Sequence, residues 1–121
     1  MCYEMTPKQE RTVLPGTVEL VILRALADGP LHGFGISRLL RDRSDGVVEV
    51  QDAALYQALH RMSREGLIEG EWGRSESNRR ARFYRLTPVG RKRMTVEERD
   101  FRRYVEGVFR VLRPTASEAT V

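Results

Sequence analysis

The spacing of the hydrophobic residues changes at Gly66, and this change constrains the fold more than any other feature of the chain. Before Gly66 the apolar residues recur at intervals of three and four, which is typical of helices, and after it they alternate with polar residues, which is typical of strands. We therefore expect helices followed by a β-hairpin, in a mainly α fold of the α+β class. The 121 residues are enough for one domain with one modest core.

Three helices are predicted ahead of Gly66, over 17–27, 31–43 and 53–65. The first is apolar on nearly every side, so we expect it at the centre of the core. Asp52 precedes the third helix and has a suitable side chain for its N-cap. Three helices joined by short turns are typical of a helix-turn-helix unit.

The second helix contains two glycines, Gly33 and Gly35, in its first turn. Each costs about 1 kcal/mol relative to alanine in a helix interior. Their presence therefore favours a close backbone contact with a neighbouring helix. We expect Phe34 to point toward the core, and we expect His32 to cap the helix or pack against its start.

A β-hairpin is predicted downstream of the helices, with strands over 67–72 and 81–86 and a polar loop over 73–80. We expect Trp72 in the core, where it would anchor the hairpin to the helices. A hairpin beside a helix-turn-helix unit forms a wing. The predicted fold of residues 14–87 is therefore a winged helix-turn-helix.

The positive charge of the chain is concentrated between Arg61 and Arg93. This window holds ten arginine or lysine residues and four glutamates, a local net charge of +6, whereas the rest of the chain has 11 basic and 13 acidic residues. A concentrated positive surface on a small domain is typical of proteins that bind the phosphate backbone of nucleic acids. The alternative is a charged face that is only solvated.

Candidate DNA-binding residues lie on the third helix and in the hairpin. The amide of Gln57 suits a bidentate hydrogen bond to adenine, and Arg61 or Arg64 can reach guanine or a phosphate. His60 is a candidate for a base or phosphate contact, and Tyr56 can fill the seam between helix and wing, bond a phosphate, or do both. On the helix the candidates are Gln51, Ala53, Ala54, Tyr56, Gln57, His60, Arg61 and Arg64, and in the wing they are Arg74, Arg79, Arg80 and Arg82.

A final long helix is predicted over 88–113, with Thr87 as its N-cap and Pro88 at its first position. It carries an apolar stripe that the three-helix core does not need. We expect the same helix of a second copy to cover this stripe in a two-fold homodimer. The alternative is that the helix folds back on its own domain.

Residues 1–13 are expected to form a flexible segment and residues 114–121 a tail.

The predicted dimer interface follows the 3-4 spacing of the final helix. A cavity lined by Phe101, Tyr104 and Val105 is a natural place for a small apolar effector, although the same residues would serve equally as plain dimer core. The interface candidates are Met94, Phe101, Tyr104, Val105, Val108, Phe109 and Leu112.

Several classes of protein do not fit the residues present. The chain has no nucleophile beside a base motif, no phosphate-binding glycine loop and no carboxylate pair in a predicted cleft, so we do not expect an enzyme. One cysteine and two histidines do not suggest a metal site, and no cofactor is expected. Its apolar runs are far shorter than a membrane span. We expect a cytoplasmic protein that does not enter the membrane.

Five fragments occur in a specific order and spacing between Leu14 and Leu112: LPGT at 14–17, GPLHGFGI at 29–36, LYQALHRM at 55–62, EGLI at 65–68 and RFYRLTPVG at 82–90. Together they resemble the PadR family of transcriptional regulators, and within it the short subfamily. The resemblance implies a homodimeric DNA-binding repressor with a winged helix-turn-helix, which dimerises through its C-terminal helix. The alternative is a winged-helix module that binds a protein or RNA without operator specificity.

The third helix and the C-terminal helix each depart from the pattern of the family. Members often have proline where this chain has Gln57, and they often begin the third helix with a Ser or Gly pair where this chain has Ala53 and Ala54. The C-terminal helix of similar proteins often carries a tryptophan at the position of Phe101. The resemblance therefore does not imply a flat aromatic effector stacked between tryptophans.

Overall fold

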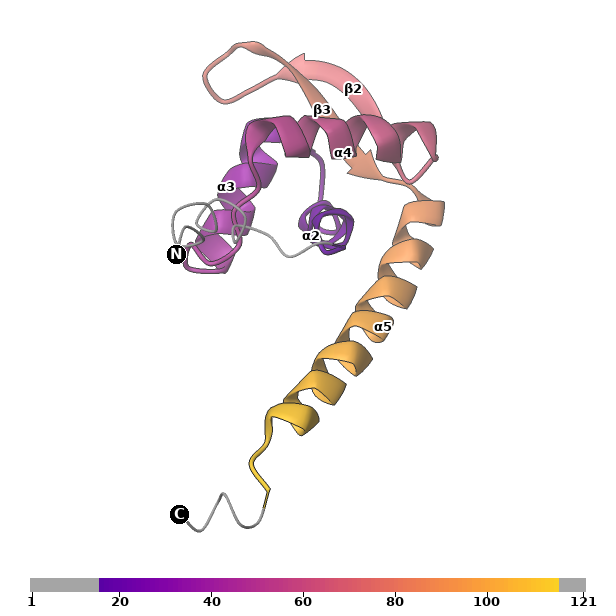
Figure 1. Ribbon diagram of the computed structural model, residues 1–121. Coiled ribbons are helices and arrows are strands. Elements are labelled where there is room, and N and C mark those ends of the chain that lie inside the picture. Colours follow the sequence, from indigo (N-terminus) through magenta and orange to yellow (C-terminus); the bar gives the residue numbers. More distant parts are fainter. Residues whose placement is uncertain (1–15, 116–121) are drawn as a thin grey trace.

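The computed structural model describes residues 16–115. Helices α2, α3 and α4 form a compact body, the β2–β3 hairpin lies beside α4, and α5 extends away from this body (Figure 1). The expected mainly α, α+β architecture is confirmed. The elements are α2 (Val18–Ala25), β1 (Leu31–His32), α3 (Gly33–Arg43), α4 (Asp52–Arg64), β2 (Ile68–Arg74), β3 (Arg80–Leu86) and α5 (Pro88–Leu112).

One hydrophobic core joins the four helices to the base of the hairpin. Helix α2 lies at its centre as predicted, and side chains from α3, α4, β2 and the start of α5 pack around it. Removing such side chains from water is the main favourable contribution to folding. The buried residues are Ile22, Leu23, Ala25, Leu26, Ile36, Leu40, Val50, Leu55, Ala58, Leu59, Met62, Leu67, Ile68 and Met94.

The start of the second predicted helix is a strand instead. Leu31 and His32 form β1, which pairs with β3 in an antiparallel sheet of order β1-β3-β2. The physical reason is that β3 has an unpaired edge, and β1 supplies hydrogen-bond partners for it. Helix α3 therefore begins at Gly33. His32 is its N-cap and accepts a hydrogen bond at Nδ1 from the backbone N–H of Gly35 at 2.9 Å, so its expected capping role is confirmed.

Two aromatic residues that were expected in the core are exposed. Phe34 is 63% exposed, because it lies in the first turn of α3 about 200° around the helix from the buried Ile36. Trp72 is 54% exposed. It shares a face of β2 with the buried Ile68, but it lies four residues further along, where the hairpin has passed the edge of the core.

The hairpin strands are longer than predicted. β2 ends at Arg74 and β3 begins at Arg80, and their register pairs Trp72 with Arg82. The turn between them is closed by hydrogen bonds from the N–H of Ser75 to the carbonyl of Arg79 at 2.9 Å, and from the N–H of Asn78 to the carbonyl of Ser75 at 2.8 Å.

The N-caps of α4 and α5 show where each helix begins. Helix α4 begins at Asp52 with Gln51 as N-cap, so the expected Asp52 cap is wrong by one residue. At the start of α5 the hydroxyl of Thr87 accepts from the N–H of Gly90 at 3.0 Å and Pro88 takes the first position, as predicted. None of the helices in residues 16–115 is long and apolar enough to span a membrane.

Candidate nucleic-acid interface

Helix α4 directs one side to the core and the other to solvent. Leu55, Ala58, Leu59 and Met62 are buried, as their spacing predicts. The predicted reading residues of α4 and its N-cap are all exposed, because they lie on the remaining faces: Gln51, Ala53, Ala54, Tyr56, Gln57, His60, Arg61 and Arg64.

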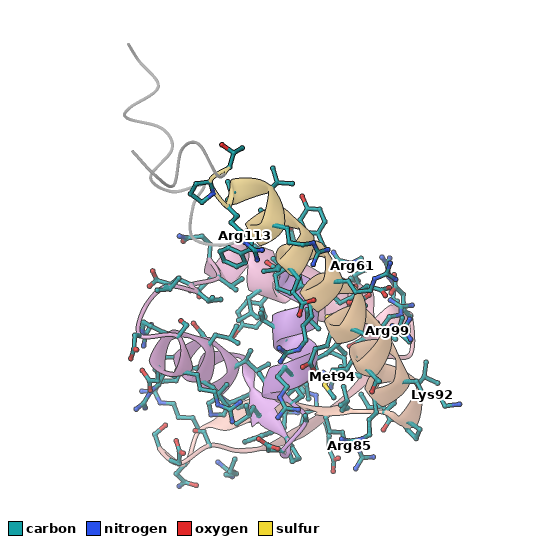
Figure 2. All side chains as sticks on the ribbon, turned by 90° about the horizontal axis from the view of Figure 1, so that it is seen from below. Arg61, Arg85, Lys92, Met94, Arg99 and Arg113 are labelled. Carbon is teal, nitrogen blue, oxygen red and sulfur yellow. The ribbon has the colours of Figure 1, made fainter. Side chains whose placement is uncertain are left out.

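These exposed residues do not form a single surface. Tyr56, His60 and Arg64 lie on the side of α4 that faces the hairpin, where they line a hollow together with Arg82. Arg61 is about 140° around the helix from Tyr56. It lies on the side of α5 (Figure 2) and lines a different groove. Arg61 and Arg64 therefore lie in different grooves. Arg64 is close to the wing, whereas Arg61 is close to α5.

The position of Tyr56 depends on the absence of a side chain at Gly33. A Cβ atom at Gly33 would collide with the Tyr56 hydroxyl and would lie 2.8 Å from its Cζ. The expected close contact between helices is confirmed at Gly33, which belongs to α3. At Gly35 it is wrong, because an added Cβ would meet the side chains of His32 and Leu31, both from β1.

The four predicted wing arginines are all exposed. The guanidinium carbon of Arg80 lies 4.3 Å from the centre of the Trp72 ring, and that of Arg82 lies 5.6 Å from it. Arg74 folds back on the turn, donating from Nη1 to the carbonyl of Asn78 at 3.3 Å. The side chains of Arg80 and Arg82 thus have defined positions although they are in contact with solvent.

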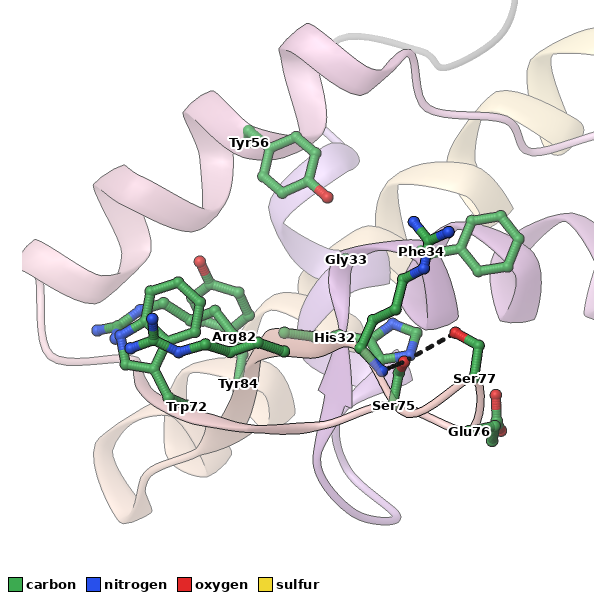
Figure 3. A pocket seen from close by; sticks show the side chains of 13 residues that line it. His32, Gly33, Phe34, Tyr56, Trp72, Ser75, Glu76, Ser77, Arg82 and Tyr84 are labelled. Carbon is green, nitrogen blue, oxygen red and sulfur yellow. Dashed lines mark hydrogen bonds between the residues drawn. The ribbon is translucent and has the colours of Figure 1, made fainter.

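A groove of about 770 Å³ separates the hairpin from α3 and α4, and we call it the wing groove. In Figure 3 Tyr56 projects from α4 on one side of it, and Trp72, Arg82 and Tyr84 lie on the hairpin opposite. Its arginines outnumber its one carboxylate, so the groove is positively charged. The lining residues are His32, Gly33, Phe34, Tyr56, Trp72, Ser75, Glu76, Ser77, Arg79, Arg80, Ala81, Arg82 and Tyr84.

The predicted dimer residues fall into two groups on α5. Met94 is 7% exposed and belongs to the core of its own chain, so the first two turns of α5 do fold back on the domain. Further along, α5 leaves the body of the molecule (Figure 1). The other predicted interface residues are half-buried at Val105 and exposed at Phe101, Tyr104, Val108, Phe109 and Leu112.

Only two of the three predicted effector residues share a groove. Phe101 and Tyr104 line a hollow of about 530 Å³ between α2, the end of α4 and α5, and Arg61 lies at its edge. Val105 is not part of its lining. This hollow is open and carries the carboxylates of Glu97 and Asp100, so it is less apolar than the sequence suggested.

An ion cluster that was not predicted from the sequence joins α2 to α5, and its two carboxylates, Glu19 and Glu97, line this hollow. Arg93 Nη1 lies 2.8 Å from Glu19 Oε2 and 3.6 Å from Glu97 Oε2. Partial burial and the neighbouring Glu19 carboxylate raise the pKa of Glu97, and Arg93 offsets part of this rise. The spacing of Arg93 and Glu97 indicates an i,i+4 pair, but Glu19 is remote in sequence.

The residues of the chain that match known proteins include the whole candidate interface. Residues 22–96 match the transcriptional regulator PadR-like family. The chain belongs to this family. The predicted PadR membership is therefore confirmed. Proteins of this family are transcriptional regulators.

Two proteins that resemble this PadR-like chain are themselves described as transcriptional regulators. The transcriptional regulator Rv3488 of Mycobacterium tuberculosis is 35% identical over 82 residues, which are 68% of this chain and 73% of the relative. A transcriptional regulator from Clostridium thermocellum has a similar structure, with a TM-score of 0.73, 26% identity and coverage of 81% of this chain and 92% of that chain.

One related structure was determined with nucleic acid. Bacillus subtilis PadR in complex with operator DNA matches the PadR-like chain with a TM-score of 0.59 and 20% identity, covering 65% of this chain and 45% of that chain. This similarity is one of fold.

No group of three or more His, Cys, Asp or Glu side chains within residues 16–115 is arranged so that it could hold a metal ion.

Proposed function

We propose that this chain is a transcriptional repressor that binds a palindromic operator as a homodimer, reading double-stranded DNA with α4 and gripping its backbone with the wing. The observation that carries the proposal is the wing groove. There Tyr56 of α4 and the guanidinium groups of Arg80 and Arg82 line one positively charged hollow, and His60 and Arg64 of α4 line an adjoining hollow that also contains Tyr56 and Arg82. Basic groups in a concave site attract phosphates, because binding releases the counterions condensed on DNA.

The roles of the α4 residues follow from their positions. With α4 in the major groove, Gln57 pairs with adenine, while Ala53 and Ala54 make methyl contacts with thymine. His60 and Arg64 lie nearer to the wing and contact a base edge or a phosphate. Base contacts of this kind determine sequence specificity, whereas the phosphate contacts of the wing set register and affinity.

The related Bacillus subtilis PadR, solved with operator DNA, supports this use of the winged helix. In a two-fold homodimer, two copies of α4 would face successive turns of the major groove, about 34 Å apart, and would therefore read a palindrome. The exposed stripe of α5 supports this dimer, because residues 16–115 leave its Phe101, Val108 and Phe109 exposed to solvent.

The proposal divides the chain at the start of α5. Residues 14–87 form the DNA-binding domain and residues 88–113 the dimerisation helix, whose first turns also complete the core through Met94. Within one chain Phe101, Tyr104 and Val105 do not form an apolar cavity, so a small apolar effector would bind only between the two copies of these residues, where the α5 helices of the dimer cross.

A selection experiment tests the DNA-binding proposal. The full chain is incubated with a pool of random duplexes, bound duplexes are recovered, and the Kd of the selected duplex is measured by fluorescence anisotropy between 50 and 200 mM salt. We expect a palindromic duplex whose affinity falls about a thousandfold over this range. The absence of any preferred duplex over competitor DNA, or stronger binding to single-stranded RNA, would contradict the proposal.

A further inference from the structure

One face of the hairpin carries an unusual set of side chains. In the antiparallel register Trp72 pairs with Arg82 and Gly70 pairs with Tyr84. Because side chains alternate along a strand, Gly70 and Trp72 share one face with Arg80, Arg82 and Tyr84. Most of these residues also line the wing groove.

Trp72 lies outside the core, and its neighbours are arginines. The guanidinium groups of Arg80 and Arg82 lie over its ring, at 4.3 and 5.6 Å from its centre. A guanidinium in this position is attracted by the negative face of the indole. The indole ring therefore serves as a platform that orders two long cationic side chains which would otherwise move freely in solvent.

Gly70 completes this arrangement. A Cβ atom at Gly70 would lie 2.7 Å from Nε of Arg82 and 2.9 Å from its Cζ and Nη2. The guanidinium of Arg82 thus lies against the bare backbone of Gly70, beside the Trp72 ring. Any larger residue at position 70 would force this guanidinium out of its place.

The charges on the two faces of the hairpin have different partners. On the opposite face, Arg85 is held by Glu69 at 3.0 Å. Within residues 16–115, no carboxylate forms a salt bridge with Arg80 or Arg82. These two guanidinium groups are therefore ordered by an aromatic ring rather than by a counter-charge, so their own charge stays available to an anion.

We infer that Trp72 and Gly70 are positioning residues, which hold Arg80 and Arg82 in the geometry that binds the phosphates of one DNA strand in the wing groove. The inference rests on the proposed function and specifies how the wing grips the backbone. A pre-ordered guanidinium loses less conformational freedom on binding than a mobile one, and its planar donors fit the phosphate oxygens. Trp72 itself need not contact DNA.

The first test replaces the platform and keeps the charges. Trp72→Leu should weaken binding to the selected operator on the order of tenfold. It should also reduce the slope of log Kd against log salt by about one to two, because one or two phosphate contacts are lost. Trp72→Phe retains an aromatic face, so its operator affinity and its salt slope should be close to those of the wild type. Arg85→Ala, which removes one charge from the opposite face of β3, is the matched control and should change the affinity less.

A double-mutant cycle separates positioning from a merely structural role. If Trp72 acts through the arginines, the loss caused by Trp72→Leu should largely disappear in an Arg80→Ala, Arg82→Ala background. Gly70→Ala, which leaves the indole in place and displaces Arg82, should reproduce the loss of affinity. It provides the same test if Trp72→Leu does not fold.

The tryptophan also supplies a direct signal. It is the only tryptophan of the chain, so intrinsic fluorescence reports on the platform alone. Adding the operator duplex to the wild-type protein should change the Trp72 emission. A Trp72→Leu variant with wild-type Kd and wild-type salt slope would overturn the inference and leave the proposed function intact. If the wild type prefers no duplex, the proposed function itself fails.

Discussion

At the scale of single residues, two glycines allow close approaches that no other residue permits. Gly33 makes room for Tyr56 between α3 and α4, and Gly70 makes room for Arg82 on the wing. Each of the two large side chains then lines the wing groove. The shape of the candidate interface therefore depends on positions that themselves offer no chemical group to a ligand.

The packing of Tyr56 against Gly33 can be tested by adding one methyl group. In Gly33→Ala the new Cβ collides with the Tyr56 hydroxyl and ring, so the tyrosine or α4 must move. We expect a loss of about 1–3 kcal/mol in the free energy of unfolding, measured in urea. Operator affinity should fall as well, because α4 carries the proposed reading residues.

A neighbouring glycine is the control for this prediction. In Gly35→Ala the added Cβ would lie 3.4 Å from the nearest side-chain atoms, which is ordinary contact. Its stability should be unchanged or higher, because alanine is favoured over glycine in a helix. Equal stabilities of the two variants would contradict the role assigned to Gly33. Tyr56→Ala should relieve the collision and reduce the cost of Gly33→Ala.

At the scale of elements, the junction between α2 and α5 determines the direction of the long helix. Met94 anchors α5 in the core, and Arg93 joins Glu19 of α2 to Glu97 of α5. Gly90 fits against the carbonyl of Leu67 without room for a Cβ. These contacts hold the first turns of α5, and the rest of the helix projects from them.

The raised pKa of Glu97 predicts a pH dependence of stability. A carboxyl group with a higher pKa in the folded state binds protons more tightly after folding. Its contribution to stability is therefore fully present below its ordinary pKa of 4.5 and is lost as the pH rises through the folded-state value. Glu97→Gln should lack this loss. Because the group is about one third exposed, we expect less than about 1 kcal/mol in urea unfolding at neutral pH.

The measurement compares unfolding curves from pH 4 to pH 7. As the pH rises, the free energy of unfolding of Glu97→Gln should increase relative to that of the wild type. Glu98→Gln, which removes the adjacent carboxylate bound to Arg102, should not show this trend. A trend in the opposite direction would mean that Arg93 outweighs burial and the repulsion from Glu19.

At the scale of the whole molecule, a closed domain is joined to a helix whose apolar stripe residues 16–115 cover only in part. The core is filled by residues up to Met94, yet α5 continues to Leu112 with Phe101, Val108 and Phe109 in contact with solvent. An apolar stripe of this length is favourable only when something covers it. A second copy of the chain is the simplest cover, because a two-fold axis buries the same stripe on both subunits.

Charged substitutions in this stripe test the dimer. Phe101→Glu or Val108→Glu should convert the protein to monomers in sedimentation experiments, because each places two carboxylates in an apolar interface. Operator affinity should fall by at least tenfold, because two linked half-sites are replaced by one. Arg110→Glu, about 180° around the helix from Phe101, should remain dimeric. A monomeric wild type would refute the proposed dimer.

Much of the architecture could be predicted because it is encoded by neighbouring residues. Helical spacing identified the buried face of α4, and the Thr87-Pro88 pair marked the start of α5. Alternation identified the hairpin, although its strands are longer than expected. The errors at Leu31, His32 and Asp52 concern the ends of elements, where local preferences compete with pairing and capping partners.

The sequence by itself determined the four helices, the hairpin, their order and the solvent side of α4, because periodicity and capping act between residues that are close along the chain. Only the tertiary structure decided that β1 pairs with β3, that Arg61 lies toward α5 and that Met94 belongs to the core. It also decided that Trp72 supports two arginines instead of filling the interior. These outcomes depend on where the hairpin and α5 pass the helices, and contacts between distant segments set those positions.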